Sequence, residues 1–434
     1  MTGPFGSAIG SRFFVSEGVP VIRGNNLSLA RTKFIDDGFV FLTEKKAEEF
    51  RNLEARPGDL IFTAAGTIGQ VGLIPARPRY RRYIISNKQM RARLDTAVVE
   101  PLFAYYWFTE PYVRHYIQSR NTGSTIPLIN LSVLRALPLP VPPIDVQRAI
   151  LGIVGALDDR IDLLRQTNAT LEAIAEALFK SWFIDFDPVH AKAAGREPEG
   201  MDAATAALFP AEFEESELGM IPKGWRVLPF LKACDLIGGA QPPASTFVDS
   251  AQDGYVRLLQ IRDFATDAHL TFIPDSPRLK RVEEDDVLIG RYGSASGDKQ
   301  KDSLGRVCRG LAGAYNVALM KLAPLEVGRE FALQLVSAES FYHYLQGVSA
   351  KAVQSGFSKS ELGNLKVVVP PMRLAERYEE FGLSIWKSVK EKRKQARALE
   401  GLRDSLLPRL ISGKLRLPEA REQLAEAQLE EVTA

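Results

Sequence analysis

The sequence predicts an α+β protein in which two related, β-rich mixed blocks alternate with two long helices. Two observations predict this fold. Residues 143–183 carry a helical pattern with apolar residues at every seventh position, which is typical of one seam of a coiled coil. The strip Val141-Pro142-Pro143, which precedes this pattern, recurs as Val369-Pro370-Pro371, and a second helical pattern follows it. An internal duplication of this kind predicts a pseudo-two-fold repeat.

Length and composition limit the possible classes. The 434 residues suffice for about three units, and the 45% hydrophobic and 25% charged residues are ordinary for globular domains. A net charge of +2 means that any affinity for nucleic acid comes from local clusters of charge. The sequence has no long apolar run and no signal-peptide pattern, so we expect neither a membrane span nor secretion. Only Cys234 and Cys308 could form a disulfide, and the histidines lack metal-ligand spacing, so we expect a cytoplasmic protein without a metal site.

The first block, residues 1–142, alternates short apolar runs with turn signals. We expect strands at residues 19–22, 59–62, 71–74 and 83–85. A helical patch is expected over residues 101–118. The proline-rich strip 137–143 then leads an extended chain into the long helix.

The first long helix is expected within residues 143–187. Pro143 and Asp145 favour its start, and Asp187-Pro188 favours its end. Its seam consists of Ile150, Leu157, Leu164, Leu171 and Leu178. Polar Asn168 interrupts the neighbouring apolar row, and a polar residue at such a position can fix the register of a helix pair. Residues 188–221 follow as a connector.

The second block, residues 222–369, repeats the first in outline. The run from Gly254 to Arg262 is similar to the run from Gly18 to Arg23. The second long helix, residues 370–415, is less regular, because Lys392 occupies a seam position between apolar residues. Those apolar seam residues are Tyr378, Ile385, Leu399 and Leu406. A charged C-terminal tail is expected over residues 416–434.

Several long strings resemble the specificity subunit of type I restriction–modification systems. They are Leu137–Pro143, Leu157–Ile161, Ala177–Pro188, Gly200–Pro210, Glu217–Trp225 and Leu406–Leu415. The resemblance spans nearly the whole chain. One departure is that the first block lacks the Ile-Pro-x-Gly-Trp string that opens the second block at Ile221–Trp225, so the first block is expected to lack an opening strand or to be shorter.

The resemblance implies both an architecture and a function. The two blocks would be target recognition domains, each reading one half of a split DNA site, and the two helices would form an antiparallel coiled coil between them. Methyltransferase subunits and motor–endonuclease subunits would bind to this chain. The chain itself would carry no cofactor, and S-adenosylmethionine, ATP and Mg²⁺ would belong to the partner subunits.

Candidate DNA-binding residues lie at matching places in the two blocks. Arg and Lys can bind guanine edges, Asn and Gln can pair with adenine, and Ser and Thr can hold phosphates. The candidates in the first block are Arg23, Asn25, Asn26, Lys88, Arg91, Arg93, Arg120, Ser124 and Thr125. Those in the second block are Gln260, Arg262, Arg291, Tyr292, Lys299, Lys301, Arg309, Lys351, Gln354, Ser358 and Lys359. Any one of them alone fits a solvated surface role better, and only their grouping favours DNA binding.

Two further patterns have ordinary explanations. The glycine-rich runs at residues 66–72 and 293–299 do not fit a phosphate-binding motif, so tight hairpin turns are expected there. The basic run at residues 387–397 fits either a solvated helix face or a surface along the DNA backbone.

Two other classes of function compete with DNA recognition. A self-contained modification–restriction enzyme would need a cofactor loop, a base-gripping loop or a nuclease centre, and the sequence has none of these motifs. A coiled-coil scaffold that binds only proteins would need the helical seam alone. Methyl transfer by the purified chain would support the first class, and the absence of a salt-dependent shift of duplex DNA would support the second.

Overall fold

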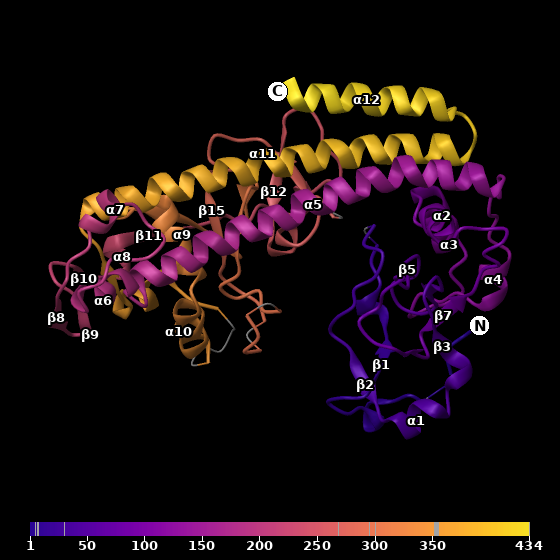
Figure 1. Ribbon diagram of the computed structural model, residues 1–434, viewed down its shortest axis with the longest axis horizontal. Coiled ribbons are helices and arrows are strands. Elements are labelled where there is room, and N and C mark those ends of the chain that lie inside the picture. The colour runs from indigo at the N-terminus through magenta and orange to yellow at the C-terminus, as the bar shows by residue number, and fades with distance from the viewer. Residues whose placement is uncertain are drawn as a thin grey trace. The chain divides into compact units, whose positions relative to one another are not determined.

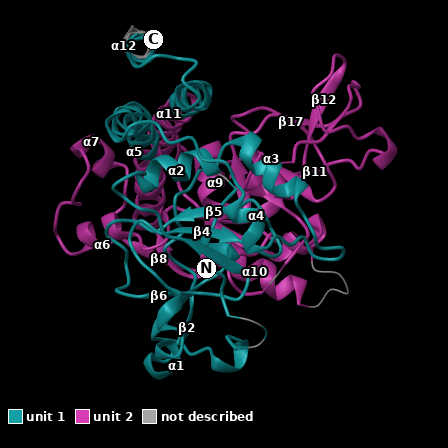
Figure 2. Cartoon of the chain, turned by 90° about the vertical axis from the view of Figure 1, so that its right-hand side faces the viewer, with its two compact units in different colours: residues 1–164, 395–434 teal, residues 165–394 magenta. Residues whose placement is uncertain are grey.

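The computed structural model describes residues 1–4, 6, 8–29, 31–267, 269–294, 296–299, 301–350 and 356–433. The chain divides into two compact units, coloured separately in Figure 2. Unit 1 comprises residues 1–164 and 395–434, and unit 2 comprises residues 165–394. Each unit therefore contains one β-rich block and part of each long helix.

Unit 1 contains the first block. Its strands are β1 (Val19–Ile22), β2 (Val40–Leu42), β3 (Glu54–Ala55), β4 (Leu60–Thr63), β5 (Val71–Leu73), β6 (Tyr83–Ile85) and β7 (Gln89–Ala92). Its short helices are η1 (Ser11–Phe13), η2 (Gly24–Asn26), α1 (Glu44–Glu48), η3 (Arg51–Leu53), α2 (Pro101–Phe108), α3 (Pro111–Ser119) and α4 (Leu131–Arg135). The strands form two sheets, ordered β2-β1-β6-β3 and β5-β4-β7. The four strands predicted in this block are confirmed.

Unit 2 contains the second block. Its strands are β8 (Phe213–Ser216), β9 (Gly219–Pro222), β10 (Arg226–Pro229), β11 (Cys234–Gly238), β12 (Tyr255–Leu259), β13 (Phe272–Pro274), β14 (Arg281–Val282), β15 (Val287–Gly290), β16 (Val307–Arg309), β17 (Gly313–Tyr315), β18 (Leu319–Pro324) and β19 (Lys366–Val369). Its short helices are α6 (Asp187–Ala193), α7 (Ala203–Ala207), α8 (Phe230–Ala233), η4 (Ala244–Thr246), η5 (Ile261–Phe264), α9 (Arg329–Ser337), α10 (Glu339–Ser349) and η6 (Lys359–Asn364). The sheets are ordered β13-β12-β17-β14, β11-β18-β15-β16, β10-β19 and β8-β9.

The two blocks share one sheet topology. In unit 1, β1 pairs antiparallel with β2 and parallel with β6, and β6 pairs antiparallel with β3. In unit 2, β12 pairs in the same way with β13 and β17, and β17 pairs antiparallel with β14. The sheet β5-β4-β7 likewise corresponds to β16-β15-β18, to which β11 is added in unit 2. The predicted duplication is therefore present at the level of strand pairing.

The long helices are α5 (Ile144–Phe183) and α11 (Met372–Ile411), which lie side by side in Figure 1. Within unit 2 they run antiparallel, as two contacts show. Arg393 of α11 donates to Glu172 of α5, whereas Tyr378, nearer the start of α11, donates its hydroxyl to the carbonyl of Ala175, further along α5. Helix α5 begins directly after Pro143, as predicted. No helix among the described residues is long and apolar enough to cross a membrane.

The buried seam follows the predicted one only in part. Ile150, Leu157, Leu164, Leu399 and Leu406 are buried together in unit 1. The remaining predicted seam residues, Leu171, Leu178 and Ile385, are only partly buried. In unit 2 the seam residue Tyr378 is buried, as are Ala175 and Trp182 of the neighbouring apolar row of α5, together with Phe179, Trp386 and Val389. The predicted apolar face is therefore buried in this half as well, but the neighbouring row is covered more fully than Leu171 and Leu178.

Three predicted boundaries differ from the structure. The patch at 101–118 is two helices, since Pro111 cannot donate a backbone hydrogen bond and holds Glu110 extended. Helix α5 ends at Phe183, before Asp187, and Phe186 adopts the left-handed conformation at φ 54° between α5 and α6. The predicted charged tail contains a helix, α12 (Leu417–Thr433), whose Ala420 is buried in the core of unit 1.

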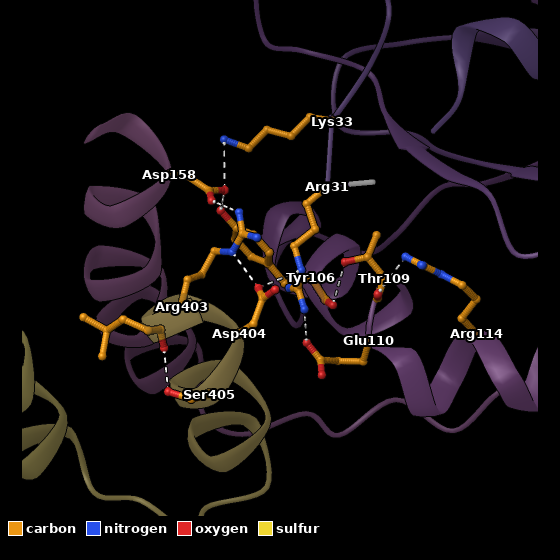
Figure 3. A network of polar contacts seen from close by, with 11 residues as sticks. Arg31, Lys33, Tyr106, Thr109, Glu110, Arg114, Asp158, Arg403, Asp404 and Ser405 are labelled. Carbon is orange, nitrogen blue, oxygen red and sulfur yellow. Dashed lines mark hydrogen bonds and ion pairs between the residues drawn. The ribbon is translucent and has the colours of Figure 1, made fainter. Parts of the chain in front are cut away.

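A buried polar network joins the first block to the helix pair inside unit 1 (Figure 3). Arg403 of α11 donates to Asp158 of α5 at 2.8 Å, and both side chains are buried. The hydroxyl of Tyr106 on α2 donates to the same carboxylate, and Lys33 lies 3.7 Å from it. Asp158 therefore contacts both the partner helix and the β-rich block.

Candidate nucleic-acid interface

Four segments of unit 1 meet at the carboxyl ends of the parallel strands β1 and β6. We call residues 23–28, 64–70, 86–88 and 120–128 the first loop cluster. Ser86 N donates to the carbonyl of Ile22 at 3.0 Å, which joins the ends of the two strands. Ala64 N donates to Lys88 O at 2.7 Å, and Gly66 N donates to Pro127 O at 2.9 Å. These bonds bring three turns and the loop after α3 to one end of the domain.

Further hydrogen bonds brace the cluster. Gln70 donates its side-chain amide to the carbonyl of Leu27 at 3.0 Å and accepts from the Thr63 hydroxyl at 2.9 Å. The β4–β5 connection holds Gly66 and Gly69 at φ 99° and 93°, so it is the tight hairpin turn predicted from the sequence.

Unit 2 builds the same arrangement at the ends of β12 and β17. We call residues 260–265, 291–294, 296–299, 301–303, 316–318 and 356–359 the second loop cluster. Asn316 N donates to Leu259 O at 3.1 Å, and Arg291 N donates to Ala318 O at 2.8 Å. Tyr292 forms an isolated bridge with Gly356, as Ala65 does with Leu128 in unit 1. The two clusters are therefore equivalent positions of the repeat.

The charge of the first loop cluster favours an anionic ligand. Its segments contain Arg23, Lys88 and Arg120 but no Asp or Glu. The side chains of Arg23 and Lys88 are exposed, and within the part of the chain that the structure describes neither has a hydrogen-bond or ion-pair partner. Cations without acidic neighbours are the groups that DNA-binding proteins place against phosphates and guanine edges.

The remaining candidates of the first block divide into two groups. Asn25, Arg120, Ser124 and Thr125 are exposed in the cluster, where Arg120 stacks on Tyr116 with 4.6 Å to the ring centroid. Three other candidates, Asn26, Arg91 and Arg93, contribute mainly to the fold.

The Asn26 side chain is fully buried; it accepts from Arg23 N at 2.9 Å and donates to the carbonyls of Ile35 and Asp37. Arg91 donates to the carbonyl of Glu54, and Arg93 forms an ion pair of 2.6 Å with the buried Asp59. These contacts favour structural roles for Asn26, Arg91 and Arg93 over contact with DNA.

Most candidates of the second block lie in the second loop cluster but have internal partners. Arg262 and Gln260 both donate to the hydroxyl of Thr271, at 2.7 and 3.0 Å. Lys299 donates to a carbonyl of α9, and Lys359 pairs with Asp235. The other contacts are Arg291 to Phe357 O, Arg291 over the ring of Tyr292, Ser358 to Glu361 and Lys301 to Asp298.

Lys351 and Gln354 lie outside the described residues. Arg309 is buried away from the loops, where it pairs with Glu330 at 2.8 Å and stacks on Trp386 at 4.0 Å from the ring centroid. That environment favours a role in packing the block on α11.

One important residue of the second loop cluster was missed by sequence reasoning. Asp302 is fully buried and accepts from the backbone and hydroxyl of Ser296, from the hydroxyl of Tyr342 and from the amide of Gln346, at 2.7–3.1 Å. Burial raises the pKa of Asp302, but the hydrogen bonds outweigh burial and lower that pKa to about 2. No local sequence signal marks this residue, since its donors lie on a turn and on α10.

The described residues contain no group of three or more His, Cys, Asp or Glu side chains that could hold a metal ion. The polar side chains of the first loop cluster are cationic groups, carboxamides and hydroxyls, and the second cluster has the same kinds of group together with the carboxylates Asp263, Asp298 and Asp302. Asp263 and Asp302 are buried, and Asp298 pairs with Lys301. The cationic groups, carboxamides and hydroxyls can bind phosphates and base edges.

The family model for the type I restriction modification DNA specificity domain matches residues 13–173, which include the first loop cluster. These residues are therefore similar to a type I restriction modification DNA specificity domain, and the relatives with which the chain aligns are type I specificity subunits. The HindI specificity subunit of Haemophilus influenzae is 24% identical over 446 residues, which cover 88% of this chain and 94% of that subunit. The MjaIX specificity subunit of Methanocaldococcus jannaschii is 23% identical over 415 residues, which cover 92% of this chain and 88% of that subunit.

Solved structures of specificity subunits are also similar. The S subunit of a type I restriction–modification system from M. genitalium is 15% identical, with a TM-score of 0.44 over 94% of this chain and 92% of that one. The HsdS subunit of Thermoanaerobacter tengcongensis is 20% identical, with a TM-score of 0.32 over 92% of this chain and 91% of that one.

Proposed function

We propose that this specificity subunit recognises a bipartite DNA target and directs separate methyltransferase and endonuclease subunits to it. Each loop cluster would read one half of the target. In this role the chain is not catalytic by itself, and S-adenosylmethionine, ATP and Mg²⁺ would be bound by the partner subunits.

One observation carries the proposal: the two blocks place equivalent loop clusters at the ends of equivalent strands while filling them with different side chains. The backbone bonds from Ser86 to Ile22 and from Asn316 to Leu259 are the same bond in two copies. By contrast, Arg23 of unit 1 corresponds to Gln260 of unit 2, since each residue directly follows its strand and begins its 3₁₀ turn. Because Arg suits guanine and Gln suits adenine, one scaffold with different loops would read two different half-sites.

The helix pair supports the role of a spacer. A 40-residue helix is about 60 Å long at ~1.5 Å per residue. DNA half-sites one helical turn apart are separated by about 34–36 Å. A helix of this length is thus sufficient to set the gap between the two half-sites, and its outer faces are where methyltransferase subunits would bind.

Exchange of one block tests the modular proposal. Residues 222–368 are replaced by the equivalent block of a related specificity subunit, and the chimera is expressed with its methyltransferase partner. Single-molecule sequencing of methylated adenines should show that one half of the modified site changes and the other half is retained. A change of both halves, or of neither, would contradict the proposal.

A further inference from the structure

The loop that follows α3 in the first loop cluster exposes a large aliphatic side chain. Ile126 is 54% exposed, which makes it the most exposed isoleucine among the described residues. A single exposed aliphatic residue is ordinary on a protein surface. The conformation and the surroundings of Ile126 therefore decide whether its exposure has a function.

The backbone of this loop is fixed by its own hydrogen bonds. The Asn121 side chain accepts from Gly123 N at 2.9 Å and from Leu128 N at 2.8 Å. Thr122 N donates to Leu128 O at 2.9 Å. A Cβ on Gly123 would overlap the carbonyl oxygen of Ile126, so the loop folds back tightly on itself.

Pro127 restricts Ile126 further. A residue that precedes proline is confined to extended backbone conformations, and a β-branched side chain has few rotamers. The carbonyl of Pro127 accepts from Gly66 N at 2.9 Å, which joins the loop to the β4–β5 turn. Ile126 is thus held in an exposed position, and covering it costs little conformational entropy.

The loop lies beside the other turns of the first loop cluster. Ala64 N donates to Lys88 O at 2.7 Å, and Ile129 N donates to Ala64 O at 2.9 Å. The segment that contains Ala64 therefore lies between the turn of Lys88 and the end of the loop. This arrangement brings the exposed cation of Lys88 and the exposed Ile126 to the same end of the domain.

The residues next to Ile126 in the loop are those of a nucleic-acid surface. Arg120 precedes the loop, and the exposed hydroxyl residues Ser124 and Thr125 come directly before Ile126. Cations and hydroxyls of this kind contact phosphates. Ile126 is therefore an apolar group placed among groups that bind the DNA backbone.

The second block has a different side chain at the same place in the repeat. Leu128 and Gly356 form equivalent bridges with the two β-rich blocks. Two positions before them, the sequence has Ile126 in the first block and Gln354 in the second. Gln354 itself lies outside the described residues. A position that is apolar in one block and polar in the other is suited to target choice.

We infer that Ile126 reads a thymine in the half-site of the first block through apolar contact with the 5-methyl group of that base. In the major groove this methyl group distinguishes thymine from the other three bases, and an aliphatic side chain is its natural partner. The hydroxyls of Ser124 and Thr125 contact the backbone beside that base. The inference rests on the proposed function, because it requires the first loop cluster to face the major groove.

Duplexes in which uracil replaces thymine test the contact, because uracil pairs in the same way and lacks only the methyl group. The half-site of the first block is the half that the block exchange retains. Each thymine of this half-site is replaced in turn, and binding by the full-length chain with its methyltransferase partner is titrated. At one position the parent chain should bind the uracil duplex about three- to fivefold more weakly, the loss expected from one uncovered methyl group.

Variants of the chain assign this difference to Ile126. Ile126→Ala should bind the thymine and uracil duplexes within about 1.5-fold of each other, because alanine leaves the methyl group uncovered. Ile126→Val keeps a branched apolar side chain and should still prefer thymine. Val98 is 50% exposed outside the first loop cluster, and Val98→Ala should retain the full difference.

Three results would overturn the inference. They are equal binding of every uracil duplex by the parent chain, an undiminished difference in Ile126→Ala, and a first half-site without thymine. Each of these results leaves sequence-selective binding intact. Failure of the proposed function would appear differently, as binding without sequence preference or as a block exchange that changes both halves or neither.

Discussion

At the scale of single residues, the repeat separates side chains that build the loops from side chains that could read DNA. Asn26 and Asp263 are equivalent, since each is buried and accepts from the backbone N–H three residues before it. Arg23 and Gln260 precede them and differ chemically. The buried side chains of Asn26 and Asp263 thus fix the two turns, whereas the side chain that begins each turn, Arg23 or Gln260, differs between the blocks.

Arg23→Ala should weaken DNA binding at one half-site. An exposed Arg that binds a guanine edge contributes about 1–3 kcal/mol of discrimination. Titration of duplexes by the chain with its methyltransferase partner should show that loss only for targets with the intact first half-site. Asn25→Ala serves as a control on the same turn, and an equal loss for every duplex would show that Arg23 contacts phosphate instead.

Asp302→Asn should destabilise the second loop cluster. The neutral amide cannot accept from all the donors that surround the carboxylate, so we expect the free energy of unfolding to fall by about 2 kcal/mol. Because the pKa of Asp302 is lowered to about 2 when folded, its stabilisation is complete above its unfolded pKa of about 3.9. Denaturant unfolding should therefore show a difference between the proteins that is constant near neutral pH and shrinks below about pH 4. A difference that persists unchanged at lower pH would contradict this origin.

At the scale of elements, each long helix is held by a different kind of contact in the two units. In unit 1 a buried ion pair between Asp158 and Arg403 joins α5 to α11. In unit 2 aromatic residues dominate. The ring centroids of Phe179, Phe183 and Tyr378 lie within 5.7 Å of one another, in tilted and edge-to-face arrangements. The polar contact is directional and therefore suited to fixing helix register.

Arg403→Ala should destabilise unit 1 by about 3–5 kcal/mol, because it leaves the Asp158 carboxylate buried without its partner. Thermal unfolding followed by circular dichroism measures the effect. Arg397→Ala on the same helix is the control, since Arg397 is exposed and its loss should cost less than about 0.5 kcal/mol. A similar cost for both variants would rule out a special role of the buried pair.

The basic run of α11 is partly neutralised. Lys390 pairs with Asp285 and Arg393 pairs with Glu172, while Lys387 and Lys394 remain exposed. We expect Lys387→Gln/Lys394→Gln to leave the salt dependence of DNA binding unchanged, as for a solvated helix face. A fall in the log–log slope of about 0.9 per residue would instead place the run on the DNA backbone.

At the scale of the whole molecule, the proposed function assigns methyl transfer and cleavage to partner subunits and only target recognition to the two blocks. The purified chain with S-adenosylmethionine, ATP and Mg²⁺ should neither methylate nor cleave DNA. Methylation should appear when the methyltransferase subunit is added, as measured by transfer of labelled methyl groups. Activity of the chain alone would identify it as a self-contained enzyme.

The sequence by itself determined the duplication, the long helices, the strands of the first block and the places in each block where polar residues gather. Those features depend on periodicity and on turn chemistry, which are local.

Only the tertiary structure decided which members of those groups are accessible. Asn26, Arg91 and Arg309 are as polar in sequence as Arg23, but segments far away in the chain bury Asn26 and cover most of the Arg91 and Arg309 side chains. The same holds for Asp302, whose donors come from a turn and a helix. Burial is a property of packing between distant segments, so no local pattern could have revealed it.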